Sequence, residues 1–259
     1  MVKRNHPIAR HWASLGVAAL VLAGCSSNYD WAWYTVLPTH PQGWRNIKFL
    51  FTGFQWTVAL TIVSIVIAMV LGIILAVMAL SSSRPLRAAS RAYVEAFRSV
   101  PPLVLILWVY YGLPVLIGIN FEPFMAGVIS LALADSAFQA EVFRAGLQSI
   151  ERGQHEAADS LGLSFSDKFR FIILPQAVRR VLPALGNQLV LMLKMSSLVS
   201  IIGLTELTRR ANELTSSIYR PLEVYSFLVL EYLVLVLVVS YFVRRLEHKM
   251  GANQLMVEA

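Results

Sequence analysis

The chain has 259 residues, of which 57% are hydrophobic and only 14% are charged, and its mean hydropathy is +0.62. Soluble domains contain about 25% charged residues, so this composition excludes an ordinary soluble domain and predicts a polytopic membrane protein. The formal net charge of +7 does not indicate a nucleic-acid partner, because the basic residues lie in short segments between apolar runs rather than along one face of a domain.

The N-terminal segment has the features of a signal sequence. Three basic residues, at positions 3, 4 and 10, precede an apolar run over residues 13–23, and Leu22-Ala23-Gly24-Cys25 is similar to a lipoprotein processing site. On this interpretation Cys25 is lipidated and becomes the mature N-terminus; the alternative is an uncleaved anchor or extra helix. Because Cys25 is the single cysteine, the chain has neither an internal disulfide nor a cysteine-based metal site.

Residues 28–48 carry an aromatic cluster. Both interpretations of the N-terminus place this cluster on the extracytoplasmic side of the membrane. A lipid-facing belt at the outer membrane–water interface is expected here, with contact to a soluble partner as the alternative. The cluster consists of Trp31, Trp33, Tyr34 and Trp44.

Five apolar segments follow, and they predict an all-α membrane protein with five core transmembrane helices, in addition to the N-terminal hydrophobic segment. The first, Phe54 to Leu80, carries no charge and exceeds the roughly 20 residues that a bilayer requires. The others run over about 103–117, 123–147, 184–204 and 224–243. Between them we expect a basic loop over 81–98, a cytoplasmic loop over 148–180 and an outer loop over 205–223. The expected organisation is an extension over 1–48, a transmembrane domain over 49–250 and a tail over 251–259.

The distribution of basic residues sets the orientation. Segments assigned to the cytoplasm hold thirteen Lys and Arg residues after the first span, whereas the outer segments hold five. Cytoplasmic loops of membrane proteins carry this excess, so the pattern predicts an inner-membrane protein with a cytoplasmic C-terminus.

The third span carries polar residues at membrane depth, where they are costly and usually face a bundle interior or an aqueous cavity. Asp135 and Gln139 lie one turn apart on one face, whereas Glu141 is turned away and is expected to pair with Arg144. For Asp135, Ser136 and Gln139 two roles remain open: they line a translocation pathway, or they bond a neighbouring helix.

The polar interruption after the third span predicts two short helices. Residues 156–161 form the first, which Gly162 ends in a left-handed conformation. Ser164 and Asp167 have the spacing of a capping box, which starts the second helix. Pro175 is expected to bend or end that helix.

Within this interruption a spaced pattern occurs: Glu-Ala-Ala, three residues, Gly, nine residues, Ile, one residue and Leu-Pro. Its positions are Glu156, Ala157, Ala158, Gly162, Ile172, Leu174 and Pro175. The pattern resembles the cytoplasmic signature of permease subunits of bacterial ATP-binding-cassette importers. In that family the stretch is a coupling helix that docks into a groove of the ATPase, and the resemblance implies the same role here. The alternative is a solvated amphipathic loop.

Two further stretches resemble polar amino acid permeases of this family. Residues 93–101 match its Phe-Arg-small-Val-Pro pattern, and residues 194–203 match its Lys, Ser-Ser-Leu and Gly pattern. The resemblance covers about residues 54–249 and implies a type I importer for a polar amino acid or a related small zwitterion. It also implies two permease protomers, identical or paralogous, two ATPase subunits and an extracytoplasmic binding protein.

Lys194 is the deepest cation of the spans. Its ammonium is expected to meet the carboxylate of a substrate or to pair with Asp135. We assign Lys194, Ser196 and Ser197 to the translocation pathway, together with the polar residues of the third span.

Missing motifs narrow the function further. The chain has no Gly-x-x-x-x-Gly-Lys-Ser/Thr run and no paired His/Cys ligands, so we expect ATP and Mg²⁺ to be bound by the partner ATPase, and we expect this chain to be no enzyme and to hold no metal. An ion-coupled secondary transporter is the main alternative, but it would need internal repeats that the sequence lacks. A membrane enzyme using Asp135 and Glu141 is disfavoured because these residues point to different faces. A lipoprotein would leave the apolar spans unexplained.

Overall fold

The computed structural model describes residues 29–251, which are helical with irregular connections and contain no strand. The signal sequence, the lipidation predicted at Cys25 and most of the C-terminal tail lie outside the described residues. The chain divides into two compact units, Met1–Trp33 and Tyr34–Ala259. Within the described part of the first unit, the rings of Trp31 and Trp33 are stacked with centroids 5.5 Å apart.

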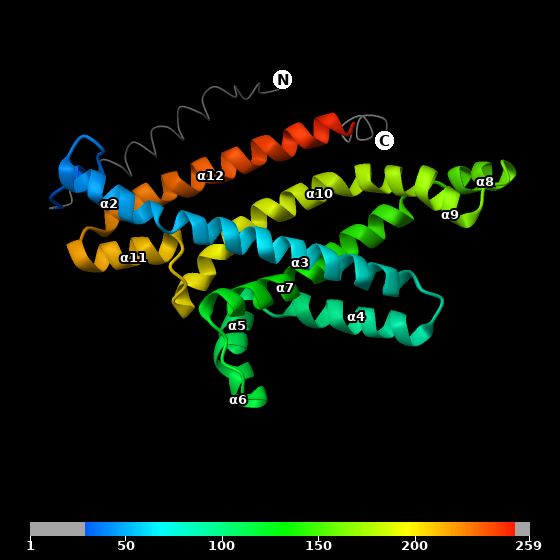
Figure 1. The fold of residues 1–259 in the computed structure, drawn as a ribbon, viewed down its shortest axis with the longest axis horizontal. Helices are drawn as coiled ribbons and strands as arrows, with labels where there is room; N and C mark the ends of the chain where they lie inside the picture. Colours follow the sequence, from blue (N-terminus) through cyan, green and yellow to red (C-terminus); the bar gives the residue numbers. More distant parts are fainter. Residues whose placement is uncertain (1–28, 252–259) are drawn as a thin grey trace, which may run out of the picture. The chain divides into compact units, whose positions relative to one another are not determined.

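The second unit is built from helices of very different lengths (Figure 1). Its α-helices are α2 (Pro41–Phe51), α3 (Phe54–Leu80), α4 (Arg84–Ser99), α5 (Pro102–Leu107), α6 (Leu113–Ile117), α7 (Pro123–Gln148), α8 (Arg152–Ser160), α9 (Phe165–Asp167), α10 (Leu174–Met195), α11 (Leu207–Ile218) and α12 (Pro221–Lys249). Two π-helical segments, η2 (Trp108–Gly112) and η3 (Lys168–Ile173), and the 3₁₀ segment η4 (Ser196–Ile202) connect some of them.

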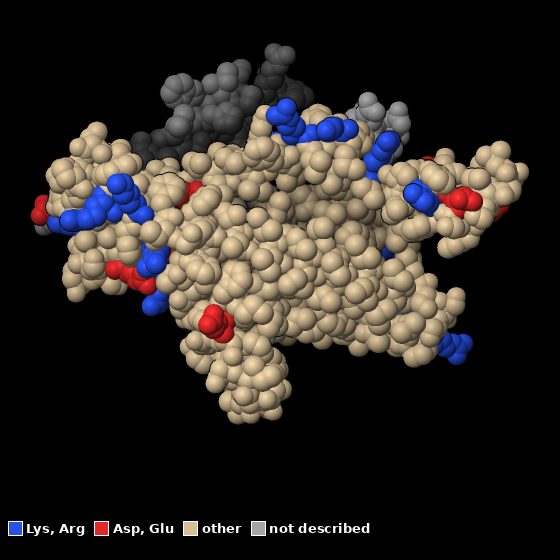
Figure 2. Space-filling model, viewed as in Figure 1, with Lys and Arg blue, Asp and Glu red and all other residues tan. Residues whose placement is uncertain are grey.

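Within residues 29–251, four helical stretches are long and apolar enough to cross a membrane, or five if the bent pair Arg84–Ser99 and Pro102–Ile117 forms one span. The two halves of that pair meet at 101°. The all-α membrane fold predicted from the sequence is therefore confirmed. Figure 2 shows that the surface over the middle of α3 is uncharged, as lipid contact requires.

Helices α3 and α7 form the centre of this unit, packed along one another. A glycine allows their close approach: a Cβ atom added at Gly72 would lie 2.8 Å from Cβ of Gln139. Around them lies the main apolar core, in which Leu60, Ile106 and Val199 are fully buried.

Two segments that we expected to be loops are helical. Residues 84–99 form α4, which buries Ser90 and Val94 against its neighbours and turns most of its arginines outward. The basic loop expected over 81–98 is wrong here, because the many charges of this stretch conceal an amphipathic helix. Residues 207–218 likewise form α11, whose first turn is capped by the side chain of Glu206.

The two prolines near the start of the fourth span do not end it. The π-helical turn η3 precedes Pro175, and in it Leu174 N–H donates to the carbonyl five residues back, of Phe169. Such a widened turn is a common irregularity within long helices. Pro183 lies inside α10, and the helix continues past it to Met195.

Candidate translocation pathway and coupling segment

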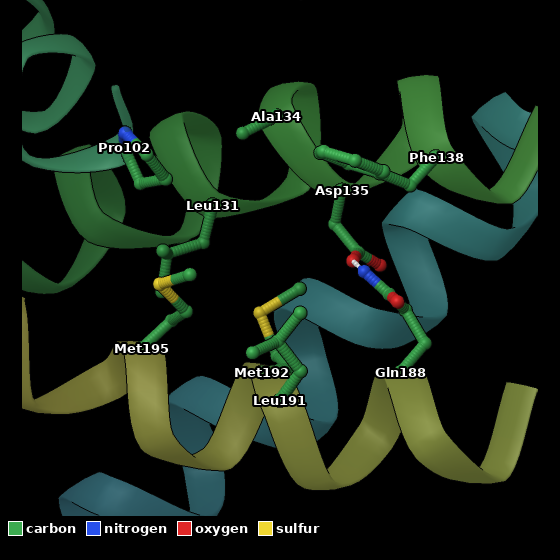
Figure 3. A pocket seen from close by; sticks show the side chains of 9 residues that line it. All are labelled: Pro102, Leu131, Ala134, Asp135, Phe138, Gln188, Leu191, Met192 and Met195. Carbon is green, nitrogen blue, oxygen red and sulfur yellow. Dashed lines mark hydrogen bonds between the residues drawn. The ribbon is translucent and has the colours of Figure 1, made fainter. Parts of the chain in front are cut away.

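Asp135 is the centre of a buried polar cluster between α7 and α10. Only 6% of the residue is exposed. Its carboxylate accepts a hydrogen bond of 2.5 Å from Nε2 of Gln139, one turn further along α7, and a second from Nε2 of Gln188 on α10. Figure 3 shows the side chains of Asp135 and Gln188 pointing toward one another. The two amides keep the carboxylate hydrogen-bonded. Without such partners, a charge at membrane depth would be very unfavourable.

A small cavity of about 40 Å³ adjoins this cluster. Apart from Asp135 and Gln188 its lining is apolar, and it includes Pro102, Leu131, Phe138 and Met192 (Figure 3). Gln188 is a residue that the sequence analysis missed, although an amide inside an apolar span was a usable signal. Its contact with Asp135 joins positions 53 residues apart, which spacing alone does not reveal.

Ser136 belongs to a different contact. Its hydroxyl lies 2.9 Å from the hydroxyl of Tyr93 and donates to the carbonyl of Leu133. The Tyr93 hydroxyl also donates to that carbonyl, at 3.3 Å. Ser136 therefore attaches α4 to α7 and is not part of the lining of the Asp135 cavity.

Lys194 lies apart from Asp135 in the single chain. It is exposed and lines another cavity, with Ser197 and Tyr232. Lys194 takes part in none of the ion pairs described within residues 29–251. The hydroxyls of Ser196 and Ser197 donate to the carbonyls of Leu193 and Lys194, three residues back.

The segment that carries the Glu-Ala-Ala pattern contains a short helix, α8. Glu156 and Ala157 are exposed on it, whereas Ala158 is fully buried. Gly162 ends the helix with φ of +69°, a conformation that favours glycine. Ser164 then accepts from the backbone N–H of Asp167, so both predicted ends in this segment are confirmed.

Three side-chain contacts tie this segment to the helix that follows it. Nζ of Lys168 lies 2.6 Å from Oδ1 of Asp159. Gln176 donates to Gln154 at 3.1 Å, and the guanidinium of Arg180 donates to the carbonyl of Ser149. Together they link α8 and the end of α7 to η3 and α10.

Three large apolar side chains of the same segment are exposed. The exposed fractions of Leu161, Phe165 and Phe171 are 77%, 80% and 65%. Of the remaining residues of the pattern, Leu174 is 40% exposed and Pro175 is exposed, whereas Ile172 is half-buried and packs with the buried Ile173.

Two carboxylates outside these sites are shielded from solvent. Glu206, in the segment expected to be an outer loop over 205–223, is fully buried; it accepts from the N–H of Arg209 at 2.7 Å and from the hydroxyl of Tyr232 at 2.9 Å. Burial raises the pKa of the Glu206 carboxyl above its usual value. Glu231 has both oxygens shielded without a hydrogen-bond partner among the described residues, beside an apolar cavity.

An all-helical chain with long apolar helices, a polar cluster buried inside them and an amphipathic segment beyond their ends has the architecture of a multi-pass membrane transport subunit. The chain belongs to the binding-protein-dependent transport system inner membrane components, because the model of that family matches residues 68–252. The resemblance drawn from the Glu156 pattern is therefore confirmed. As a member of this family the chain is a transport component and not an enzyme, and it works with a binding protein and an ATPase.

Known relatives match most of the chain. It is 35% identical over 207 residues to the arginine transport system permease protein ArtQ of Bacillus subtilis, covering 80% of this chain and 94% of that protein. It is 38% identical over 205 residues to the probable glutamine ABC transporter permease protein GlnM of the same organism, covering 79% and 94%. A crystal structure of an amino acid ABC transporter with histidines is similar, with a TM-score of 0.74 and 38% identity, over 79% of this chain and 95% of the other.

Proposed function

We propose that the chain imports a polar amino acid, or a related small zwitterion, as the permease subunit of an ATP-driven transporter. The relatives named for arginine and glutamine support this substrate class. The observation that carries the proposal is the coupling segment, in which an exposed pattern residue, Glu156, and the exposed apolar side chains Leu161 and Phe165 lie on two short helices and their connection, tied to the spans. An apolar surface of this kind marks a protein contact.

The proposed complex contains two permease protomers, identical or paralogous, two ATPase subunits and an extracytoplasmic binding protein. Membrane lipids surround the apolar spans. The excess of basic residues on the side of α8 and of the C-terminal end of α12 supports a cytoplasmic location for both. ATP and Mg²⁺ are bound by the ATPase subunits and not by this chain.

Closure of the ATPase subunits would move α8, and the three contacts to η3 and α10 would carry that motion into the spans. Nucleotide and binding protein would then bias one equilibrium between inward-facing and outward-facing states. The substrate would pass the polar cluster of Asp135, Gln139 and Gln188. Lys194, Ser196 and Ser197 are proposed to line the pathway where α10 and η4 meet a second protomer.

The test is uptake of radiolabelled glutamine and arginine into vesicles that contain the chain, its ATPase and its binding protein. Glu156→Lys should abolish ATP-dependent uptake and release the ATPase on purification. Glu151→Lys is the matched control, because it reverses an exposed charge on the same segment outside the pattern, and it should retain both properties. Full uptake by Glu156→Lys, or uptake by the permease without an ATPase, would overturn the proposal and favour a secondary transporter.

A further inference from the structure

A charged groove adjoins the Asp135 cavity along α7. Its volume is about 420 Å³, roughly ten times that of the cavity. Side chains of both signs line it: Arg91, Glu95 and Arg98 from α4, and Glu141 and Arg144 from α7. None of these residues belongs to the Asp135 cluster or to the coupling segment.

The groove and the cavity lie beside one another on α7. Asp135 and Glu141 point to different faces, about 120° apart around the helix, and Phe138, three residues from each, lies between them. Gln148, at the end of the helix, also lines the groove. The ten residues from Phe138 to Gln148 span about 15 Å, and α8 begins four residues further on, at Arg152.

Phe138 is the contact between the two spaces. Its ring lines the Asp135 cavity (Figure 3), and the guanidinium of Arg98, which lines the groove, lies 5.2 Å from the centroid of the same ring. This arrangement is a cation–π contact. Arg98 takes part in none of the ion pairs within residues 29–251, whereas Arg144 is paired with Glu141 at 2.6 Å.

We propose that the groove is an inner vestibule for a zwitterionic substrate and that Phe138, held by Arg98, is the barrier between it and the Asp135 cavity. This inference rests on the proposed function and specifies its pathway. The cavity of about 40 Å³ is too small for an amino acid, whereas the groove falls in the range of about 300–1,000 Å³ typical of small-molecule sites. Movement of the Phe138 ring therefore joins the two spaces.

The charges of the groove fit the two ends of an amino acid. The guanidinium of Arg98 offers N–H donors to a carboxylate, and Glu95 and Glu141 offer acceptors to an ammonium. A phosphate headgroup of an anionic lipid is the competing ligand, which the three guanidiniums would attract, but it brings no ammonium to the two carboxylates that line the groove. The mixed charge therefore favours the zwitterion.

The barrier is tested by the accessibility of single cysteines in inside-out vesicles that contain the full chain, its ATPase and its binding protein. Ala134→Cys reports on the cavity and Gln148→Cys on the groove, with a membrane-impermeant methanethiosulfonate as the probe. The parent chain gives the background of Cys25. We expect Gln148→Cys to react quickly, and Ala134→Cys to react slowly until Phe138→Ala is added, which should raise its rate several-fold.

Phe143→Ala is the matched control, because Phe143 lies on the same helix but lines a different, apolar cavity. It should leave the rate of Ala134→Cys unchanged. Equal labelling of Ala134→Cys with and without Phe138, or an equal increase with Phe143→Ala, would overturn the barrier. These rates need no transport, so a failure of the proposed function would be seen separately, as absent uptake by the parent complex.

The ligand is tested through Arg98. We expect Arg98→Gln to lower the maximal rate of amino acid uptake several-fold, Arg98→Lys to restore part of it, and Arg84→Gln, at the far end of the same helix, to have no effect. The concentration for half-maximal uptake should not change, because the binding protein captures the substrate. If the effect of Arg98→Gln occurred only in vesicles containing phosphatidylglycerol, the groove would be a lipid site and the assignment to the substrate would be wrong.

Discussion

Nζ of Lys168 lies 2.6 Å from Oδ1 of Asp159, and this ion pair joins α8 to the π-helical turn that leads into α10. The side chain of Asp159 is 59% exposed and that of Lys168 is 16% exposed. Pairs this exposed contribute about 0–1 kcal/mol to stability. The contact therefore matters less for folding than for holding the coupling segment in a fixed orientation.

Breaking this pair should impair coupling while sparing the fold. We expect Asp159→Lys and Lys168→Asp each to lower ATP-dependent uptake several-fold with little change in the melting temperature of the purified chain. The double exchange should restore much of the uptake, because it re-forms the pair in the opposite sense. Double and single variants that transported equally poorly would show that the two positions act independently.

A second prediction concerns the amide that satisfies Asp135. Gln188→Leu removes one donor from a buried carboxylate, and such a loss costs about 1–3 kcal/mol. The variant should melt at a lower temperature. Asp135→Leu together with Gln188→Leu removes both groups of this bond and should recover part of the lost stability, although Gln139 then lacks its acceptor, while uptake stays low if the cluster serves the substrate. Thermal unfolding and uptake measured on the same preparations separate the two roles.

The sequence predicted those structural features that depend on residues close together in the chain. Apolar runs located α3 and α7 to within a residue or two, and local chemistry located the end of α8 at Gly162 and the cap at Ser164. These features depend on residues a few positions apart. Resemblance to a family then identified the segment around Glu156, which composition alone would have left as a charged loop.

Features that depend on tertiary contacts were missed. One partner of Asp135, Gln188, is on another helix, and Glu206, in the segment expected to be an outer loop, is buried completely by packing. The π-helical turn before Pro175 was also not predicted. A proline in a sequence predicts a break in a helix, but it does not show how the helix accommodates the proline.

Glu206 predicts a pH dependence of stability. Its carboxyl has a usual pKa of 4.5, and burial raises the folded-state pKa above this value. The folded state therefore keeps the proton to higher pH than the unfolded state does. The contribution of Glu206 to the stability of the fold is fully present below the pKa of this carboxyl in the unfolded state. It is lost as the pH rises through the pKa of the carboxyl in the folded state.

Glu206→Gln removes this titration and keeps a side-chain oxygen to accept from the N–H of Arg209. The difference in melting temperature between Glu206→Gln and the parent should therefore move in favour of the variant as the pH rises from 4 to 8. Melting of both purified proteins across this range checks the prediction. A difference that stayed constant, or that favoured the variant most in acid, would contradict it.

Close packing of α3 on α7 gives the last prediction. Any side chain at Gly72 must displace Gln139, since the added Cβ would lie 2.8 Å from Cβ of Gln139 and 3.2 Å from the backbone nitrogen of Ala140. Overpacking of this kind costs about 1–3 kcal/mol, and Gln139 is also a donor to Asp135. Gly72→Ala should thus lower both the melting temperature and uptake. Gly153→Ala, on α8 with open space around it, is the control and should stabilise its helix slightly, by about 0.5–1 kcal/mol. If Gly72→Ala and Gly153→Ala had the same melting temperature, the prediction would be wrong, and α3 and α7 would be packed more loosely than the 2.8 Å distance indicates.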